Sequence, residues 1–226
     1  IPFARHDLTA LECEAVARVI QSDWLAAGPE VMAFEEEFAA FTHRRYALCV
    51  NSGSSGLLLA LKALHLPSDA TVITAACGFP ATLAPILHCG YRPRFVDYAL
   101  PSHNADLHQV EALLRTERVD AMILAHTLGN PLDLDPLRAL CTAHGVPLIE
   151  DCCEAVGATY HDAPVGSLGT LGVFSFYPSH QMTALGGGGM VVCDDLELIQ
   201  QLRSLRDWGK RSLPTYRMKD IGTEYT

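Results

Sequence analysis

The chain has 226 residues, of which 49% are hydrophobic and 19% are charged. That much apolar material can bury a sizeable core, and it excludes a disordered chain, which is poor in apolar residues and strongly charged. Sixteen lysine and arginine residues against 26 aspartate and glutamate residues give a formal net charge of −10. So acidic a protein is not expected to bind nucleic acid, because phosphate backbones require clustered lysine and arginine.

The cysteines stand singly along the chain, apart from the neighbours Cys152 and Cys153. None forms a C-x-x-C pair, so the zinc-site signature is missing and we expect no metal ligands. Most lie in apolar stretches, which is typical of reduced thiols in a cytoplasmic protein. We see neither a signal peptide nor an apolar run of about 18 residues, and therefore expect neither export nor a membrane span.

Helical and strand-like segments alternate in the sequence. Apolar spacing predicts helices over residues 8–22, 30–42 and 57–64. The first would have Leu11, Val16, Val19 and Ile20 near one face, and the second would have Met32, Phe34 and Phe38 directed inward. Runs of β-branched and apolar residues predict strands at 46–50, 71–74, 94–96, 121–125, 147–149, 173–176 and 189–193. This alternation indicates an α/β fold with a mostly parallel sheet flanked by helices. Periodicity fades near Arg206, so we expect one large domain over 1–205 and a connector over 206–226.

Small and polar residues follow the first predicted strand. The segment Asn51–Gly56 (NSGSSG) links that strand to a helix. Its exposed N–H groups and the start of the helix suit a phosphate group. The lysine of a P-loop is missing, which excludes that motif. An ordinary Ser/Gly turn without a ligand is an equally good interpretation.

Carboxylates gather at the end of a later strand. The segment Leu148–Glu154 (LIEDCCE) places three acidic side chains after a buried apolar run. Buried carboxylates are costly without a partner, and a metal ion, a protonated ring nitrogen or a helix N-terminus would each serve. The alternative is that Asp151 simply caps a helix.

A candidate acid–base residue follows another strand. Residues 172–181 (GVFSFYPSHQ) put Ser175 at a strand end and His180 in the loop beyond it. Imidazole exchanges protons near neutral pH, which suits proton transfer in a pocket. The glycines at 186–189 permit close backbone approach before the next strand. An ordinary surface histidine is the alternative.

Five segments in this order together resemble the DegT/DnrJ/EryC1/StrS family of pyridoxal-phosphate-dependent sugar enzymes: 51–64, 74–97, 123–137, 149–160 and 175–183. The resemblance implies the aspartate-aminotransferase (type I) fold, with the large cofactor-binding domain present. It also implies a small C-terminal domain that residues 1–226 do not include, and a homodimer.

The resemblance implies a role for each matching position. Ser54 and Ser55 would hold the cofactor phosphate, with help from the Ser175 hydroxyl. Phe79 would stack on the pyridine ring. Asp151 would pair with the ring nitrogen and keep it protonated, so that the ring can withdraw electrons.

Two positions depart from the family's aminotransferases. Glu154 stands where they commonly carry a glutamine near the cofactor oxygen, and His180 replaces their Schiff-base lysine. The lysine-to-histidine exchange is similar to that in the 3-dehydrases of nucleotide-linked 4-keto-6-deoxyhexoses. These enzymes bind pyridoxal or pyridoxamine phosphate non-covalently, and His180 would be the acid–base residue.

Two other functions are alternatives. An aminotransferase is disfavoured because residues 160–200 contain no lysine. A catalytically inactive, cofactor-binding homologue stays open, because four glycines replace the family's usual G-E-G-G.

A further departure concerns an iron–sulfur cluster. The CDP-linked subtype of these dehydrases binds one through cysteines that follow the RDWG segment, here residues 206–209. Residues 210–226 contain no cysteine, so we expect no cluster. This favours the cluster-free, GDP-linked subtype, which uses L-glutamate as amino donor. The nucleotide and the sugar stereochemistry stay open.

Overall fold

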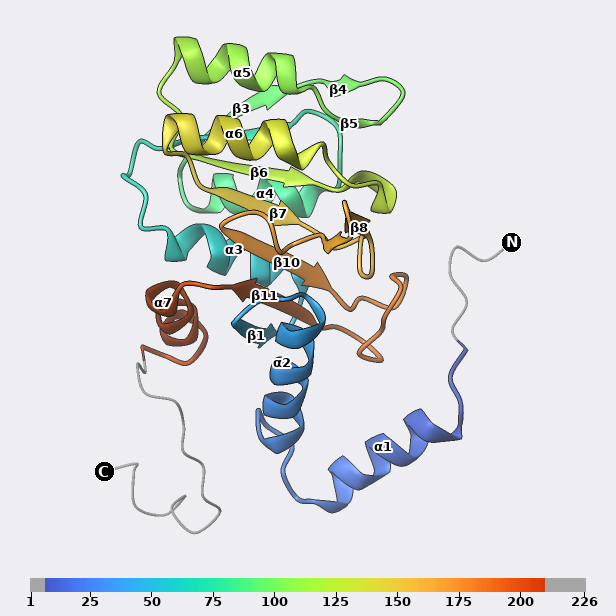
Figure 1. The fold of residues 1–226 in the computed structure, drawn as a ribbon. Coiled ribbons are helices and arrows are strands. Elements are labelled where there is room, and N and C mark those ends of the chain that lie inside the picture. Colours follow the sequence, from blue (N-terminus) through green and yellow to red (C-terminus); the bar gives the residue numbers. More distant parts are fainter. Residues whose placement is uncertain (1–6, 210–226) are drawn as a thin grey trace.

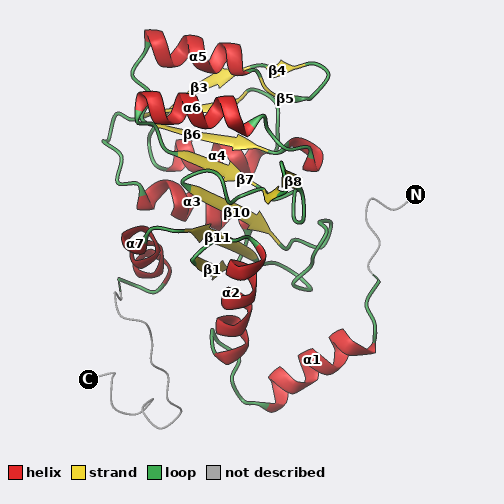
Figure 2. Ribbon diagram, viewed as in Figure 1, coloured by secondary structure: helices red, strands yellow, loops and turns green. Residues whose placement is uncertain are grey.

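A seven-stranded sheet lies between two layers of helices in the computed structural model, which describes residues 7–209 (Figures 1 and 2). Its strands are, in spatial order, β1 (Tyr46–Val50), β11 (Gly189–Cys193), β10 (Leu171–Ser175), β7 (Leu148–Asp151), β6 (Ala121–Ala125), β2 (Thr71–Ala75) and β3 (Arg92–Val96). Only β11 runs antiparallel to its neighbours. The predicted α/β fold with a mostly parallel sheet is therefore confirmed.

Helices cover both faces of this sheet (Figure 1). One face carries α3 (Gly53–Ala63), α4 (Pro80–His88) and α7 (Leu196–Arg206). The other carries α2 (Pro29–Phe41), α5 (Leu107–Thr116) and α6 (Leu134–His144). The remaining elements are helix α1 (Ala10–Gln21), the turn Thr127–Gly129, and the paired short strands β4 (Tyr98–Ala99) with β5 (Asn104–Ala105) and β8 (Thr159–Tyr160) with β9 (Ala163–Pro164). No helix among residues 7–209 is long and apolar enough to cross a bilayer.

Alternate strand residues fill the two halves of the core. Ile123 and Ile149 pack on the side of α3 and α4, whereas their neighbours Met122, Leu124 and Leu148 pack toward α5 and α6. This is the period of two expected of a strand that is buried on both faces. The continuous apolar runs in the sequence follow from this double coverage.

An aromatic cluster anchors α2 to the sheet. The Phe38 ring is 3% exposed and meets the rings of Phe174 and Phe176 edge-on, with centroids 5.0 and 5.5 Å apart. Phe34 lies against Phe38 and Phe176. Edge-to-face packing adds to the stabilisation from burial. The predicted inward positions of Phe34 and Phe38 are therefore confirmed, whereas Met32, which was also predicted to point inward, is about half exposed.

Two predicted features differ in the structure. Helix α3 begins at Gly53, four residues before the predicted start, because the Ser52 side chain accepts the N–H of Ser55 and caps it. Helix α1 has the predicted apolar positions but buries none of its residues, and it projects away from the sheet (Figure 1). Leu11 and Ile20 are 73% and 62% exposed. Most of the predicted connector, 210–226, lies outside the described residues.

The aromatic cluster provides a test of core packing. Replacing the buried ring in Phe38→Ala should lower the free energy of unfolding by about 3–5 kcal/mol, because it leaves a cavity beside four other rings. Phe41→Ala, at a half-exposed ring of the same helix, should cost about 1 kcal/mol or less. Urea denaturation of both variants measures the difference. Equal losses would contradict the role of Phe38.

Candidate functional site

The largest cavity lies where the parallel strands end. It has a volume of about 990 Å³ and is lined by the loops after β1, β2, β6, β7 and β10. Carboxyl ends of parallel strands meet at one edge of a sheet, which is where α/β proteins bind ligands. The strand order therefore gathers side chains from segments that are far apart in the sequence.

The start of α3, which follows β1 in the sequence, forms one wall of the cavity. The Ser52 carbonyl accepts the N–H of Gly56 at 3.0 Å, and its side chain accepts that of Ser55 at 3.1 Å. The N–H groups of Gly53 and Ser54 are thereby left at the helix start, where the partial positive charge of the helix adds to them. The exposed side chain of Ser54 lies on the cavity wall. This wall suits an anion.

Two glycines let the backbone close up behind that wall. A Cβ on Gly53 would lie 2.7 Å from the Cys153 sulfur and 2.8 Å from Cβ of Ser175. A Cβ on Gly189 would lie 2.6 Å from the Ser52 carbonyl carbon. Close approach thus requires glycine at both positions. For Gly189 this agrees with the prediction made from glycines 186–189, whereas a Cβ on Gly186 would meet no atom within 4 Å. The Ser175 hydroxyl accepts the N–H of Tyr177, so its proton remains available to a ligand.

Asp151 is a buried carboxylate at the end of β7. Its Oδ2 accepts the Thr82 hydroxyl at 2.7 Å, and its Oδ1 accepts the N–H of Cys153 at 3.1 Å. The Cys153 thiol lies beside it, and burial together with this negative charge raises the pKa of the thiol well above its ordinary value. The N–H of Cys153 is also part of the turn after β7, so the carboxylate is oriented rather than free to rotate.

His180 lies in the loop after β10, on the cavity wall. The backbone N–H of His180 donates to the Tyr177 carbonyl at 2.9 Å, and the rings of the two residues meet edge-on with centroids 6.2 Å apart. The neighbouring Gln181 amide donates to the Glu154 carbonyl at 2.6 Å, and the Glu154 carboxylate accepts the N–H of Leu128. Glu154 thus ties together three loops beside the cavity.

The structure brings together most of the predicted site residues. His180, Ser54, Phe79, Asp151, Glu154 and Ser175 all line the cavity. Phe79 is 72% exposed, at the start of α4. Ser55 is not in the lining, because its N–H and hydroxyl both engage the Ser52 side chain.

Glu150, which sequence reasoning missed, is fully buried next to Asp151. Its carboxylate accepts the N–H groups of Gly166, Leu168 and Gly169 and lies 3.0 Å from His126 Nε2. Burial opposes the charge of Glu150, but the hydrogen bonds from His126 and from these N–H groups outweigh it and hold the pKa of the carboxyl below its usual value. The donors lie far from Glu150 in the sequence, so no local pattern predicts them.

His126 serves this buried carboxylate and its own loop. Its Nδ1 accepts the N–H of Leu132 at 3.0 Å, so Nε2 carries the proton that points to Glu150. The histidine thus orders the loop after β6.

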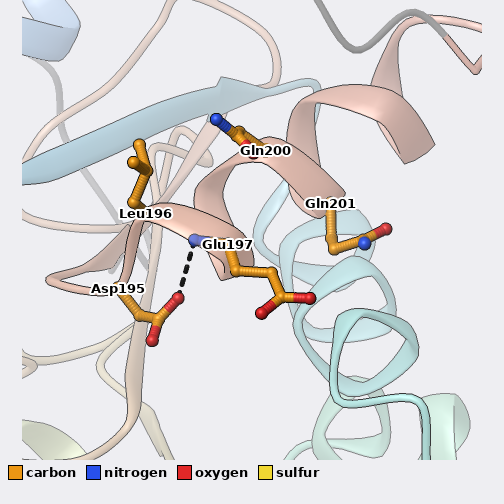
Figure 3. Close-up of a pocket in the computed structure, with 5 residues that line it drawn as sticks. All are labelled: Asp195, Leu196, Glu197, Gln200 and Gln201. Carbon is orange, nitrogen blue, oxygen red and sulfur yellow. Dashed lines mark hydrogen bonds between the residues drawn. The ribbon is translucent and has the colours of Figure 1, made fainter.

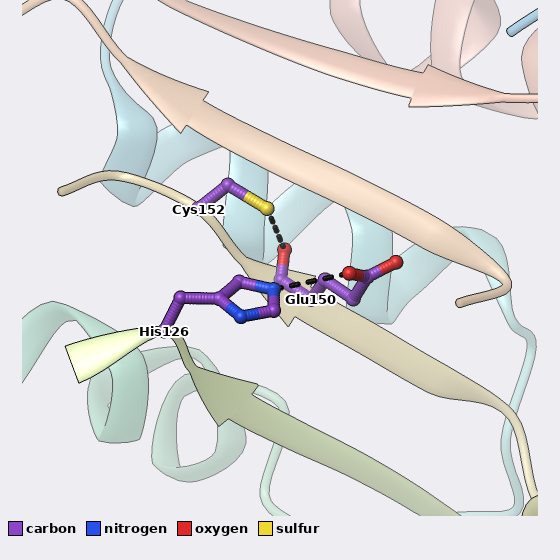
Figure 4. Close-up of side chains that lie close together, drawn as sticks. All are labelled: His126, Glu150 and Cys152. Carbon is purple, nitrogen blue, oxygen red and sulfur yellow. Dashed lines mark hydrogen bonds and ion pairs between the residues drawn. The ribbon is translucent and has the colours of Figure 1, made fainter. Parts of the chain in front are cut away.

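A compact group of His126, Glu150 and Cys152 has the ligand types of a metal site (Figure 4). Both nitrogens of His126 and the carboxylate of Glu150 are already engaged. Burial raises the pKa of the Cys152 thiol well above its ordinary value, whereas metals bind the thiolate. This group is therefore a saturated hydrogen-bond network, not a vacant ligand set.

A second hollow, of about 520 Å³, lies at the start of α7 (Figure 3). Its lining includes Asp195, Leu196 and Glu197. The Asp195 carboxylate accepts the N–H groups of Glu197 and Leu198 and so caps the helix. This hollow has a structural carboxylate and lacks the converging loops of the larger cavity.

Lysine is nearly missing from the described chain. Between residues 7 and 209 the one lysine is Lys62, exposed in the last turn of α3. It is ten residues from the helix cap Ser52, which at 1.5 Å per residue is about 15 Å along the helix. Within this described part of the chain, no lysine therefore lines the cavity.

Comparison with known proteins gives a consistent family. The profile described as the DegT/DnrJ/EryC1/StrS aminotransferase family matches residues 6–226. The dTDP-4-dehydro-2,6-dideoxy-D-glucose 3-dehydratase of Saccharopolyspora spinosa is 45% identical over 194 residues, which are 82% of this chain and 42% of that protein.

Solved structures include both kinds of enzyme. The aminotransferase of Psychrobacter cryohalolentis is similar with a TM-score of 0.88 and 34% identity, over 92% of this chain and 53% of that one. The E. coli GDP-4-keto-6-deoxy-D-mannose-3-dehydratase with bound hydrated PLP has a TM-score of 0.84 and 30% identity, over 90% and 53%. The chain spans about half the length of these relatives.

The buried Glu150 should make stability depend on acidity. Because its pKa in the folded protein lies below the ordinary 4.5, its charge stabilises the fold above that pH, and this contribution is lost as the pH falls through the folded-state pKa. Glu150→Gln should therefore lower the free energy of unfolding at neutral pH by about 3–5 kcal/mol. It should also flatten the loss of stability between about pH 5 and pH 3.

Chemical denaturation across this pH range tests the expectation. The control is Glu117→Gln, at an exposed carboxylate that pairs with Arg94, which should cost about 1 kcal/mol or less. An unchanged acid profile in Glu150→Gln would show that another group controls the acid sensitivity.

Proposed function

Since the chain belongs to the DegT/DnrJ/EryC1/StrS aminotransferase family, we propose that its cavity binds pyridoxal or pyridoxamine phosphate without a covalent bond to the protein. We further propose that the protein removes the C3 hydroxyl of a nucleotide-linked 4-keto-6-deoxyhexose. The observation that carries the proposal is the cavity wall, which presents His180 and, among residues 7–209, no lysine. A histidine cannot form the imine that the lysine of an aminotransferase forms with the cofactor.

The residues present fit this cofactor. The free N–H groups at the start of α3, with the hydroxyls of Ser54 and Ser175, suit the phosphate. Asp151 suits a protonated ring nitrogen, because it is a buried carboxylate to which no cationic side chain of residues 7–209 is bonded. The buried hydroxyl of Thr127, on the same wall, has no protein partner among the described residues.

Each residue then has a distinct task. When bound, the cofactor supplies an electron-withdrawing ring beside the sugar's C4 carbon. Phe79, whose ring is exposed at the cavity mouth, stacks on that ring and shields it from water. His180 would take a proton from the C4′ carbon of the cofactor and give one to the departing C3 hydroxyl oxygen of the sugar. Glu154 and Gln181 hold the His180 loop against the other walls.

The relatives named above favour a dehydratase without excluding an aminotransferase. The S. spinosa and E. coli proteins are named as 3-dehydratases, and the P. cryohalolentis structure as an aminotransferase. L-glutamate is the proposed amino donor that converts the cofactor to its pyridoxamine form. A homodimer is proposed as well, because Leu11 and Ile20 on α1 expose apolar surface that a second copy would cover.

The cofactor proposal predicts a specific absorbance experiment. Pyridoxal phosphate added to the full-length protein should bind reversibly, and borohydride should leave no covalent adduct on lysine, because His180 cannot form one. L-glutamate should convert the spectrum to that of pyridoxamine phosphate. A lysine adduct found by mass spectrometry would instead indicate an aminotransferase, and no binding at all would indicate an inactive homologue.

The role of His180 is tested by His180→Asn. This variant should bind the cofactor with wild-type affinity, because the phosphate and ring-nitrogen contacts are unchanged. Its rate of sugar dehydration should fall by about 10²- to 10⁴-fold, the contribution of general acid–base catalysis. CDP- and GDP-linked substrates are assayed separately. The control is His161→Asn, whose side chain is largely exposed on the turn after β8. Dehydration at wild-type rate in His180→Asn would refute the assignment.

A further inference from the structure

Thr82 connects two walls of the cavity. It lies in the first turn of α4, and its hydroxyl crosses to β7 to donate to Asp151 Oδ2 at 2.7 Å. Both side chains are buried, and both residues line the cavity. The hydrogen bond joins segments 69 residues apart. It therefore fixes α4 relative to the carboxylate at the strand end.

Threonines at the C-terminal ends of two other helices, α2 and α5, use their hydroxyls differently. The hydroxyl of Thr42 donates to the Phe38 carbonyl at 2.8 Å, and that of Thr116 donates to the Ala112 carbonyl at 2.7 Å. Such bonds to the residue four positions earlier are the ordinary behaviour of threonine in helices. Thr82 is only the third residue of α4, so the residue four positions earlier, Gly78, is outside the helix. Its hydroxyl is thus available to Asp151.

The same turn holds Phe79. The N–H of Thr82 donates to the Phe79 carbonyl at 3.0 Å, and Phe79 is the residue that precedes the helix. Pro80 restricts the backbone between them. One residue therefore bonds both to the backbone of the exposed aromatic and to the buried carboxylate.

We propose that Thr82 is a positioning residue for the cofactor ring, which orients the Asp151 carboxylate toward the ring nitrogen and keeps Phe79 in register with it. This inference rests on the proposed function, because the ring nitrogen belongs to the proposed cofactor. Each carboxylate oxygen of Asp151 already accepts one hydrogen bond, so one lone pair on each remains for the ring N–H. Without Thr82 the carboxylate can turn about its soft terminal torsion.

The test compares Thr82→Val, which removes the hydroxyl at nearly constant volume, with Thr82→Ser, which keeps it. Pyridoxal phosphate is titrated into each full-length protein, and the absorbance of the bound cofactor is followed against pH. Thr82→Val should bind about tenfold more weakly, the equivalent of about 1.4 kcal/mol. The pH at which the bound ring nitrogen loses its proton should also fall. Thr82→Ser and the control Thr116→Val should stay within about twofold of wild type.

A purely structural role predicts another pattern. Thr82→Val would then melt at a lower temperature without cofactor, yet match the wild type in affinity and in the pH dependence of its spectrum, which would overturn the inference alone. Failure of the wild-type protein to bind pyridoxal phosphate would overturn the proposed function itself.

Two further variants keep the test decisive. Should Thr82→Val not fold, Thr82→Ala takes its place with the same expectations. In an Asp151→Asn background, replacing Thr82 by valine should weaken binding by less than about twofold more, because Thr82 acts through that carboxylate. A full additional tenfold loss there would show that Thr82 acts independently of Asp151.

Discussion

The carboxylate of Glu150 is the interaction on which the site's architecture depends. A buried charge is stable in a protein only when it is surrounded by donors, and Glu150 has three backbone N–H groups and His126. The turn that supplies the N–H groups is held from its other side by Arg44, which donates to the carbonyls of Gly166 and Gly169 and pairs with Asp194. The strand that ends in Asp151 is thereby joined to both flanking segments.

The two neighbouring carboxylates of β7, Glu150 and Asp151, have different surroundings. Glu150 and Asp151 are adjacent in β7, so their side chains point to opposite faces of the sheet. The first is saturated with protein donors, whereas the second faces the cavity with lone pairs to spare. One acidic dipeptide thus provides an internal anchor on one face and, under the proposed function, a cofactor-binding group on the other.

The strand positions could be predicted from the sequence because short apolar runs are bounded by turn residues. The cavity followed from the parallel order, which places Asp151, Ser175 and the start of α3 at one edge. The bond between Ser52 and Ser55 was not predictable, because any of the three serines of the segment could cap the helix. The exposure of α1 was not predictable either, since an apolar stripe does not reveal whether its partner surface lies in the same chain. Glu150 and Thr82 were missed because their partners are distant in the sequence.

The lack of lysine among the described residues of the cavity wall has a thermodynamic consequence. A cofactor that is held only by hydrogen bonds, charge and stacking exchanges with the surrounding pool, so the loaded fraction follows its free concentration. Ligand binding to the folded state stabilises it by RT ln(1 + [L]/Kd), about 2.7 kcal/mol at a hundredfold excess over Kd. Under the proposed function, the supply of vitamin B6 would therefore set the free energy of unfolding of the protein as well as its catalytic rate.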